Sequence, residues 1–373
     1  MTVRVLHVFS TFAPGGPQVR TARLLPELER SWRHAILALD GCTDARALLA
    51  PELEVEILAA PRKRGSLATT RALVGILKSQ APDLLLTYNW GALDALLASR
   101  IVRPRAVVHH EDGFRPDEVA GFKARRVWVR RWILPGTSAV IVPSRRLEEI
   151  ARELWKLDGA RLARIANGLD VAGFPRADGN ASRRRELGIP NDALVIGAVG
   201  HLRAEKNPVR LIQACARMTS QPHLLVLGDG PERPAVERAV RELGLESRVH
   251  LVGHRPAPQA DYRAMDVFAL SSDTEQMPVA LLEAMACSLP VVSTDVGDVK
   301  DMLPAEQASF VVPLAADALA QAAERLLADA ELRRALGAQN RARVEREYSF
   351  AGMVRAYREV YERALGLEPA ANA

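Results

Sequence analysis

One continuous stretch, residues 271–294, does most to limit what this chain can fold into. It reads SSDTEQMPVALLEAMACSLPVVST and follows the apolar run DVFAL at 266–270. Pro278 stands near the start of its central segment, at a helix position that needs no N–H, and most of the positions after it are apolar. A helix that is apolar almost all round is buried. The order strand, loop, buried helix and buried strand therefore predicts a parallel α/β sheet.

Two glutamates in this stretch are separated by seven residues, Glu275 in the loop and Glu283 within the helix. A carboxylate among apolar residues needs a partner, because an isolated buried charge is costly. One interpretation of Glu283 is a structural ion pair with a Lys or Arg, and the other is an acceptor for the hydroxyls of a ligand diol. The loop leads into a helix N-terminus, which attracts phosphate. A diol acceptor next to a phosphate site indicates a nucleoside diphosphate.

The pattern S-x-x-E-x-x-P-x-x-L-L-E-A-M-A-x-x-x-P-V-V in this stretch resembles the C-terminal signature of retaining GT-B glycosyltransferases, glycosyltransferase family four or glycosyl transferases group 1. The resemblance implies that Glu283 binds the ribose of a nucleotide. It also implies that Glu275 and the backbone N–H groups after it, those of Gln276, Met277 and Val279, hold the donor sugar and phosphates. The family usually has glycine where this chain has Gln276, which leaves the choice of sugar open.

A second segment, LVIGAVGHLRAEKNP at 194–208, resembles the family motif G-R-L-x-x-x-K, whose Arg and Lys clamp the diphosphate. Lys206 matches the Lys, but His201 occupies the Arg position, and a histidine lacks the rigid fork of donors that arginine presents. Arg203, two residues on, is the alternative source of positive charge. The resemblance also places Gly200 and Gly297 beside the diphosphate. Solvated Arg and Lys side chains on an ordinary loop are the competing interpretation.

The first half alternates short apolar runs with helical segments, starting from VRVLHVF at 3–9, which predicts a doubly wound parallel sheet. Ligands bind at the carboxyl ends of strands in such sheets. The Gly15–Gly16 pair after the first run lets a backbone approach a ligand, but the spacing G-x-G-x-x-G of dinucleotide-binding folds is missing. The resemblance implies a phosphate and acceptor loop at Gly15 and Gly16, and a simple turn is the alternative.

HHEDGF at 109–114 follows another predicted strand and places four titratable residues in a row. The family commonly has a histidine near this position that contacts the donor sugar. His109, His110 and Asp112 are all candidates; we expect His110 first from the phase of the strand, and Asp112 second. A loop or helix-start role is the alternative for Asp112.

Residues 121–136, GFKARRVWVRRWILPG, combine basic side chains with tryptophans at helical spacing. This pattern fits a helix lying on an anionic membrane surface, and it also fits a helix that packs its tryptophans inward and leaves its arginines in water. Arg62, Lys63 and Arg64 would extend the same basic surface. Nucleic acid is not an expected partner, because no nucleic-acid-binding module accompanies the charge.

The 373 residues suggest two domains, and IANGLD at 165–170 resembles the family motif near the end of the first one. We predict a GT-B architecture of two Rossmann-like domains facing a cleft: an acceptor-side domain at 1–175, a donor domain at 190–345 and a C-terminal helix at 346–373 that returns toward the first domain. The three cysteines are scattered, no signal peptide or membrane span is evident, and the expected location is the cytoplasm, extending to the inner membrane face as a peripheral protein.

The resemblance implies transfer of a glycosyl group, with retention, from a nucleotide sugar to a glycan or lipid-linked acceptor in polysaccharide or glycoconjugate biosynthesis. We expect Glu275, His110, Lys206 and Arg203 to act on the reacting groups. No cofactor or metal is expected, because no D-x-D motif is evident. The alternatives are a nucleotide-sugar epimerase or hydrolase of the same fold, and a catalytically weak sugar-nucleotide-binding protein. The base, sugar, acceptor, linkage and oligomeric state stay open.

Overall fold

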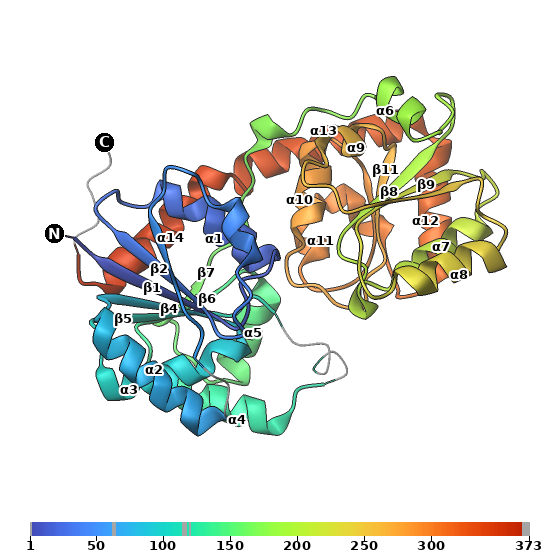
Figure 1. The fold of residues 1–373 in the computed structure, drawn as a ribbon. Helices are drawn as coiled ribbons and strands as arrows, with labels where there is room; N and C mark the ends of the chain where they lie inside the picture. The colour runs from blue at the N-terminus through green and yellow to red at the C-terminus, as the bar shows by residue number, and fades with distance from the viewer. Residues whose placement is uncertain (1, 62–64, 114–117, 119–120, 368–373) are drawn as a thin grey trace. The chain divides into compact units, whose positions relative to one another are not determined.

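The computed structural model describes residues 2–61, 65–113, 118 and 121–367 (Figure 1). The basic residues at 62–64 therefore lie outside the described part of the chain. The chain divides into two compact units. One comprises Met1–Phe114, Ala120–Ala166 and Ala351–Ala373, and the other comprises Arg115–Val119 and Asn167–Phe350.

Within the described residues, the first unit contains a parallel sheet of seven strands in the order β3-β2-β1-β4-β5-β6-β7. The strands are β1 (Arg4–Phe9), β2 (Arg33–Ala38), β3 (Val55–Leu58), β4 (Leu84–Tyr88), β5 (Ala106–His110), β6 (Ala139–Val142) and β7 (Leu162–Arg164). The central strands β4 and β5 are buried at every position, as expected for a parallel sheet that is covered on both faces.

Helices cover both faces of this sheet: α1 (Gly16–Leu24), α2 (Ser66–Gln80), α3 (Leu93–Val102), α4 (Ala124–Ile133), α5 (Arg145–Glu153) and α14 (Phe350–Ala364) (Figure 1). Alternate residues of the strands point to opposite faces. One face packs aliphatic side chains such as Leu6 and Leu85 against α2, α3 and α5. The other face carries His7 and His110 and lies against α14, whose Tyr361 contacts His110.

The second unit contains a parallel sheet of six strands in its described residues, in the order β10-β9-β8-β11-β12-β13. The strands are β8 (Val195–Val199), β9 (His223–Leu227), β10 (Val249–Gly253), β11 (Val267–Leu270), β12 (Val291–Thr294) and β13 (Val311–Val312). Its helices are α6 (Ala181–Glu186), α7 (Pro208–Arg217), α8 (Arg233–Glu242), α9 (Gln259–Arg263), α10 (Val279–Ala286), α11 (Val299–Met302), α12 (Ala316–Ala328) and α13 (Ala330–Glu347). The predicted fold class, two doubly wound α/β halves, is confirmed.

The stretch at 271–294 is the core of the second unit. Strands β11 and β12 pair in parallel, with Phe268 opposite Val291, and α10 connects them. Leu281, Leu282, Ala284, Met285 and Ala286 are buried, because the helix has apolar residues on nearly every side. The crossover brings the loop before α10 to the carboxyl end of the sheet.

Two segments deserve separate description. The second unit starts at Asn167 after the continuous part of the first unit that ends at Ala166, so the polar stretch between the domains predicted at 1–175 and 190–345 belongs to the second unit and includes α6. Arg184 of α6 is buried and donates to three backbone carbonyls and to Asp266, which makes this charged segment part of the fold. The apolar run at 308–313 contributes only the two residues of β13, after a 3-10 turn over Ala305–Phe310.

None of the helices among the described residues has both the length and the apolar composition needed to cross a membrane.

Candidate active site

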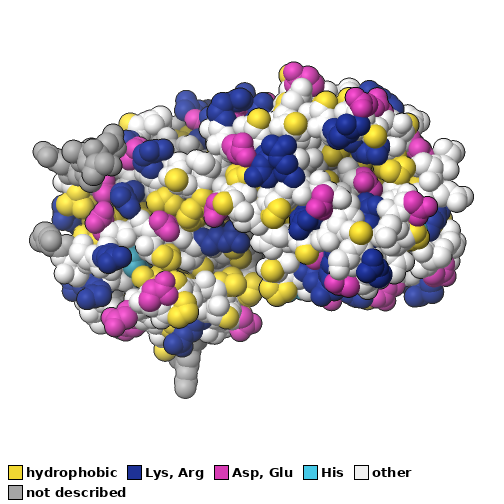
Figure 2. Space-filling model, turned by 90° about the horizontal axis from the view of Figure 1, so that it is seen from above, with side chains coloured by type: hydrophobic (Ala, Val, Ile, Leu, Met, Phe, Trp, Pro, Cys, Tyr) yellow, Lys and Arg dark blue, Asp and Glu magenta, His cyan; other side chains and the backbone are white. Residues whose placement is uncertain are grey.

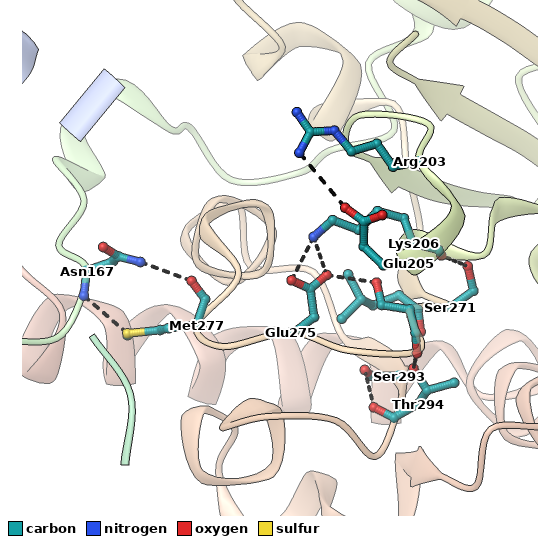
Figure 3. Close-up of polar contacts among 11 residues, drawn as sticks. Asn167, Arg203, Glu205, Lys206, Ser271, Glu275, Met277, Ser293 and Thr294 are labelled. Atoms are coloured by element: carbon teal, nitrogen blue, oxygen red, sulfur yellow. Dashed lines mark hydrogen bonds and ion pairs between the residues drawn. The ribbon is translucent and has the colours of Figure 1, made fainter. Parts of the chain in front are cut away.

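The site forms where loops meet at the carboxyl ends of β8, β11 and β12 (Figure 3). Lys206 ends the short turn after β8, and Glu275 lies in the loop after β11. The Lys206 ammonium nitrogen is 2.6 and 2.7 Å from the two carboxylate oxygens of Glu275, and the Ser272 hydroxyl donates to Oε1 of Glu275 at 2.7 Å. Glu275 is only 8% exposed. Its carboxylate is therefore fixed by donors from two loops.

Backbone and hydroxyl contacts hold these loops together. The Ser271 hydroxyl donates to the carbonyl oxygens of Lys206 and Asn207 at 3.2 and 3.0 Å. The Thr294 hydroxyl, at the end of β12, donates to the Ser272 carbonyl at 2.6 Å. Three consecutive strand ends therefore support the Lys206–Glu275 pair, as is common for ligand sites of open α/β sheets.

A second ion pair, between Arg210 and Asp273, supports the same loop. Arg210 of α7 donates to Oδ1 of Asp273 at 2.5 Å and to the Ser271 carbonyl at 2.8 Å. The Asn207 side chain caps α7 and also donates to Asp273 at 3.2 and 3.3 Å. Sequence reasoning missed Asp273, Arg210 and Asn207; the only signals were the Asn207-Pro208 helix start and the acid two residues before Glu275.

His201 and Arg203 lie on the loop between β8 and Lys206 and are exposed. Partial burial of the ring and the positive charge of Arg203 lower the pKa of His201. A neutral His201 at pH 7 supplies no positive charge for a diphosphate. The Arg203 guanidinium is 3.9 Å from the carboxylate of Glu205. The positive charge of this loop therefore resides on Arg203 and Lys206.

The loop from Glu275 to α10 has a fixed backbone path. The Asn167 side-chain amide donates to the Met277 carbonyl at 3.0 Å (Figure 3), and the Asp298 N–H donates to the Gln276 carbonyl at 3.1 Å. Gly297 has φ +54°, and a Cβ atom there would lie 2.3 Å from the Glu275 carbonyl oxygen. Only glycine fits so close to this loop. Val279 is the first residue of α10.

Glu283 lies four residues into α10, about 6 Å along the helix axis from Val279. The hydroxyl of Tyr262, on α9, donates to Oε2 of Glu283 at 2.8 Å. Sequence reasoning did not single out Tyr262. Glu283 follows Glu275 along the same segment but has a different partner, so the two carboxylates have different surroundings.

In the first unit, His110 is buried and already has partners for both ring nitrogens. Nδ1 is 3.2 Å from the Thr87 carbonyl oxygen and Nε2 is 2.9 Å from the Tyr361 hydroxyl. Because a carbonyl only accepts, Nδ1 carries the proton and Nε2 accepts from Tyr361. Burial, and then the charge of Arg20, lower the pKa of His110 well below its usual value. A ligand contact by His110 would have to displace one of these partners.

Asp112 accepts two hydrogen bonds from Arg20 of α1, at 2.5 and 3.0 Å, and its own N–H donates to the Asn89 side chain at 2.7 Å. Gly15 and Gly16 stand at the start of the same helix, α1. The structure therefore links the predicted phosphate and acceptor loop to Asp112 through Arg20.

His109 points to the opposite face of β5 from His110. Its Nδ1 is 2.8 Å from the Thr87 hydroxyl and its Nε2 is 3.5 Å from Glu111, which also pairs with Arg130 at 3.0 Å. Burial works to raise the pKa of Glu111, but Arg130 and His109 outweigh it and the pKa is lowered. His109 is therefore part of a buried ionic group.

These contacts define what each unit can do chemically. The second unit brings together two cationic side chains, a fixed carboxylate and a helix start, and it carries a further carboxylate, Glu283, on that helix. Cations and free N–H groups stabilise an anion such as a diphosphate. Among the described residues, no group of three or more His, Cys, Asp or Glu side chains is arranged to hold a metal ion.

Two family models match the chain. The model for glycosyl transferases group 1 matches residues 180–343, and that for the glycosyl transferase 4-like domain matches residues 15–168. The chain is 31% identical over 237 residues to a D-inositol 3-phosphate glycosyltransferase of Kineococcus radiotolerans, covering 57% of this chain and 54% of the relative. It is 25% identical over 378 residues to an alpha-maltose-1-phosphate synthase of Mycolicibacterium smegmatis, covering 94% and 95%. The match spans about half the length of the first curated relatives.

Solved structures with the same fold include Anabaena HepE in complex with UDP-glucose, with a TM-score of 0.83 and 20% identity over 98% of this chain and 100% of that one. Sucrose-phosphate synthase from Thermosynechococcus elongatus has a TM-score of 0.79 and 22% identity, with 97% and 99% coverage.

Proposed function

The chain belongs to the glycosyl transferases group 1, and from this premise we propose that it transfers a sugar, with retention of configuration, from a nucleotide sugar to a glycan or lipid-linked acceptor. We propose a role in the biosynthesis of cell-surface polysaccharide or glycoconjugate. The observation that carries the proposal is the Lys206–Glu275 pair, placed just before a helix that bears Glu283.

The proposed roles are those that the family resemblance implies, and the positions of the residues support them. Glu283 accepts the ribose hydroxyls. Lys206 and Arg203 face the diphosphate, together with the N–H groups of Gln276, Met277 and Val279. Glu275 accepts hydroxyls of the donor sugar. We assign the acceptor side to the first unit, where Asp112 is held by Arg20 on the helix that starts at Gly15 and Gly16.

In the transfer, the bond between the anomeric carbon and the donor phosphate oxygen breaks, and the diphosphate leaves with the electron pair. The acceptor oxygen bonds to the same carbon on the same face, and its proton passes to a phosphate oxygen of the leaving group. The protein supplies position and positive charge where negative charge develops. We propose that Lys206 and Arg203 provide this charge without a metal ion; full activity after dialysis against EDTA supports this, and activity restored only by a divalent cation contradicts it.

The proposal is tested by calorimetric titration of the protein with UDP, GDP, ADP and NAD. UDP comes first because the HepE complexes contain UDP or UDP-glucose. A charge-assisted hydrogen bond contributes roughly 1.5–3 kcal/mol, so Glu283→Gln should weaken binding of the preferred diphosphate by about ten- to a hundredfold. Glu242→Gln, at an exposed position of α8, is the matched control and should bind like the wild type.

A turnover assay with nucleotide sugars separates the alternatives. Release of free nucleoside diphosphate from a nucleotide sugar without any acceptor favours a hydrolase. Binding with no turnover of any donor favours a nucleotide-binding protein, and the neutral His201 is the feature consistent with that outcome. Failure to bind any of the three diphosphates contradicts the proposed donor site.

We further propose that the protein acts at the inner face of an anionic membrane and contacts it through α4. Trp128 and Trp132 are 64% and 53% exposed, and their rings are parallel within 3°, with centroids 6.5 Å apart. Lys123, Arg125 and Arg131 are exposed on the same segment. Exposed tryptophans flanked by cations fit the interface of an anionic bilayer.

The neighbouring helices extend this surface. Arg100 of α3 lies over the Trp132 ring, 5.0 Å from its centroid, so α3 and α4 are adjacent. Of the Lys and Arg residues in the segments 65–81, 90–105 and 121–136, all except the buried Arg130 are at least partly exposed, and the one acidic residue of these segments is Asp94. Figure 2 shows a different distribution on the face seen from above, where basic and acidic side chains are interspersed.

Flotation with vesicles tests the membrane proposal. We expect the protein to bind vesicles that contain phosphatidylglycerol and not vesicles of phosphatidylcholine, and a Trp128→Ala/Trp132→Ala variant to lose most of this binding. Leu243→Ala/Leu314→Ala, which removes exposed apolar side chains of the second unit, is the matched control. Equal flotation of both variants and the wild type contradicts a role for α4.

A further inference from the structure

The hydroxyl of Tyr262 donates to Glu283, the carboxylate proposed to bind the ribose. The Tyr262 side chain is fully buried, and its ring packs against Phe174 and Phe268, with centroids 6.3 and 6.1 Å away. Phe268 belongs to β11, so the ring is held against the sheet. Because these contacts fix the ring, its hydroxyl has a fixed position beside α10.

The hydroxyl has two acceptors within reach and one proton to donate. Oε2 of Glu283 is 2.8 Å away and the carbonyl oxygen of Ala280 is 3.2 Å away. A charged acceptor forms the shorter and stronger bond, so the proton goes to Glu283. Burial, and then the charge of Glu283, raise the pKa of Tyr262 well above its usual value of 10. Tyr262 therefore stays protonated and acts as a donor throughout the working pH range.

A carboxylate has about four acceptor positions, and a vicinal diol needs two of them in one orientation. Glu283 has several rotatable bonds and is only partly buried, so the orientation of its carboxylate depends on the groups that contact it. The bond from Tyr262 occupies one position on Oε2 and restricts that orientation. Fixing an acceptor before a ligand arrives lowers the entropy cost of binding.

We infer that Tyr262 is a positioning residue that holds Glu283 in the orientation needed to accept both ribose hydroxyls, and so determines the preference for ribose over 2′-deoxyribose. This inference rests on the proposed function, because it assumes that Glu283 faces the ribose. Tyr262 itself does not contact the nucleotide and acts only through Glu283.

The experiment compares affinities for UDP and 2′-deoxy-UDP, or for the GDP or ADP pair if the wild type prefers that base. Removing one hydroxyl costs the wild type a charge-assisted hydrogen bond, so we expect it to prefer the ribonucleotide by about tenfold or more. In Tyr262→Phe, which removes only the oxygen, the preference should fall to about two- to threefold, chiefly through weaker ribonucleotide binding.

Phe174→Leu is the packing control, because it trims a neighbour of the Tyr262 ring and leaves the hydroxyl in place. It should lower the melting temperature and reduce the preference less than Tyr262→Phe does, because Phe268 still packs against the ring and the hydroxyl remains. A Tyr262→Phe/Glu283→Gln double variant should bind no more weakly than Glu283→Gln alone, because the two residues act as one unit.

An unchanged preference in Tyr262→Phe, or an equal loss of affinity for both nucleotides, overturns the inference and leaves the ribose assignment intact. A wild type that binds both nucleotides equally well overturns the ribose assignment, and the inference with it. Circular dichroism and thermal melting of each variant establish that the comparison is made on folded protein.

Discussion

Lys206 and Glu275 restrict each other's side-chain conformation, because the ammonium group contacts both oxygens of the carboxylate. In the proposed mechanism the lysine has two functions, to fix Glu275 and to face the leaving diphosphate. Lys206→Met would remove both, and we expect kcat/KM to fall by about a hundredfold or more. Lys78→Met on the exposed side of α2 is the control and should leave turnover unchanged. Near-normal turnover in Lys206→Met would show that the diphosphate is stabilised elsewhere.

A substitution at His201 should strengthen the binding of a nucleoside diphosphate instead of weakening it. Arginine presents a planar fork of permanent charge that the neutral imidazole lacks. We expect His201→Arg to bind the nucleoside diphosphate about three- to tenfold more tightly, as measured by calorimetry. The pKa of His201 is lowered, so the wild type should bind more tightly as the pH falls below 6.5, and the arginine variant should lose this dependence. A decrease in affinity would indicate that position 201 points away from the ligand.

At the residue scale, the sequence identifies residues that belong to a recognisable motif, but it does not identify the residues that hold them in place. Lys206 and Glu275 were singled out separately, and the structure pairs them. Asp273, Arg210 and Tyr262 belong to none of the motifs. Arg210 and Tyr262 reach the site because helices from distant parts of the sequence meet there in space, and the only signal for Asp273 was its closeness to Glu275. His110 fits the expected strand phase, but its partner Tyr361 comes from a helix 251 residues away.

At the element scale, α10 is fixed at its C-terminal end by α13. Arg341 of α13 donates to the Ala286 carbonyl at 2.6 Å, and a Cβ at Gly337 would lie 1.9 Å from the Ser288 carbonyl oxygen. The two helices therefore approach closely only because residue 337 is a glycine. The apolar segment after Pro278 predicted α10, but this contact is a property of the pair of helices.

A pair of helical glycines tests this contact. We expect Gly337→Ala to lower the free energy of unfolding by about 1–3 kcal/mol or more, because it forces α13 away from α10. Gly75→Ala, at an exposed position of α2 with open space around it, should instead raise it by about 0.4–1 kcal/mol. Urea unfolding of the two variants measures both values. A stabilised Gly337→Ala variant would contradict the close packing.

The same scale explains which elements could be predicted. Strands such as β3 and β5 form from short apolar runs between turns, the pattern that predicts a buried strand. The edge strand β13 covers only two residues of the apolar run at 308–313, because Val291 N–H already donates to the Gln307 side chain and this contact holds 305–310 in a turn. A hydrogen bond between a side chain and the backbone does not change the apolar periodicity of the sequence, so that periodicity cannot predict it.

At the scale of the whole molecule, acid should destabilise the protein through the buried histidines of the first unit. Burial lowers the pKa of His34 to about 4. Burial, and then the nearby His34 and His110, lower the pKa of His7 well below 6.5, and burial, and then the charge of Arg20, do the same for His110. These groups are neutral in the folded state, whereas the unfolded chain binds protons below pH 6.5. The stability that these neutral histidines contribute is therefore fully present above pH 6.5 and is lost as the pH falls toward 4.

Urea unfolding at several pH values measures this loss, which should approach about 1.4 kcal/mol per pH unit for each histidine. His34→Gln should make the dependence shallower, whereas His254→Gln, at an exposed position, should not. Identical slopes for the wild type and His34→Gln would show that other groups cause the acid sensitivity.

Two α/β halves could be predicted from alternating strands and helices, and the comparisons and the sheet orders agree with that prediction. The bounds of the units could not be predicted as well. The predicted domains left residues 176–189 between them, but Arg184 is buried in that stretch by four acceptors that lie later in the sequence. The composition of a segment does not determine its contacts, and the boundary between the two units depends on those contacts.

The return of α14 to the first unit has a consequence for synthesis on the ribosome. The first unit receives its strands early, but Tyr361 and Arg358, which bind His110 and Glu27, emerge only after the second unit has been made. At about 5–20 residues per second, the roughly 200 intervening residues take on the order of 10–40 s. Residues 167–350 are contiguous, so the half that is translated later can finish folding first. Until then, the nascent first half presents an uncovered face of its sheet to the chaperones of the cell.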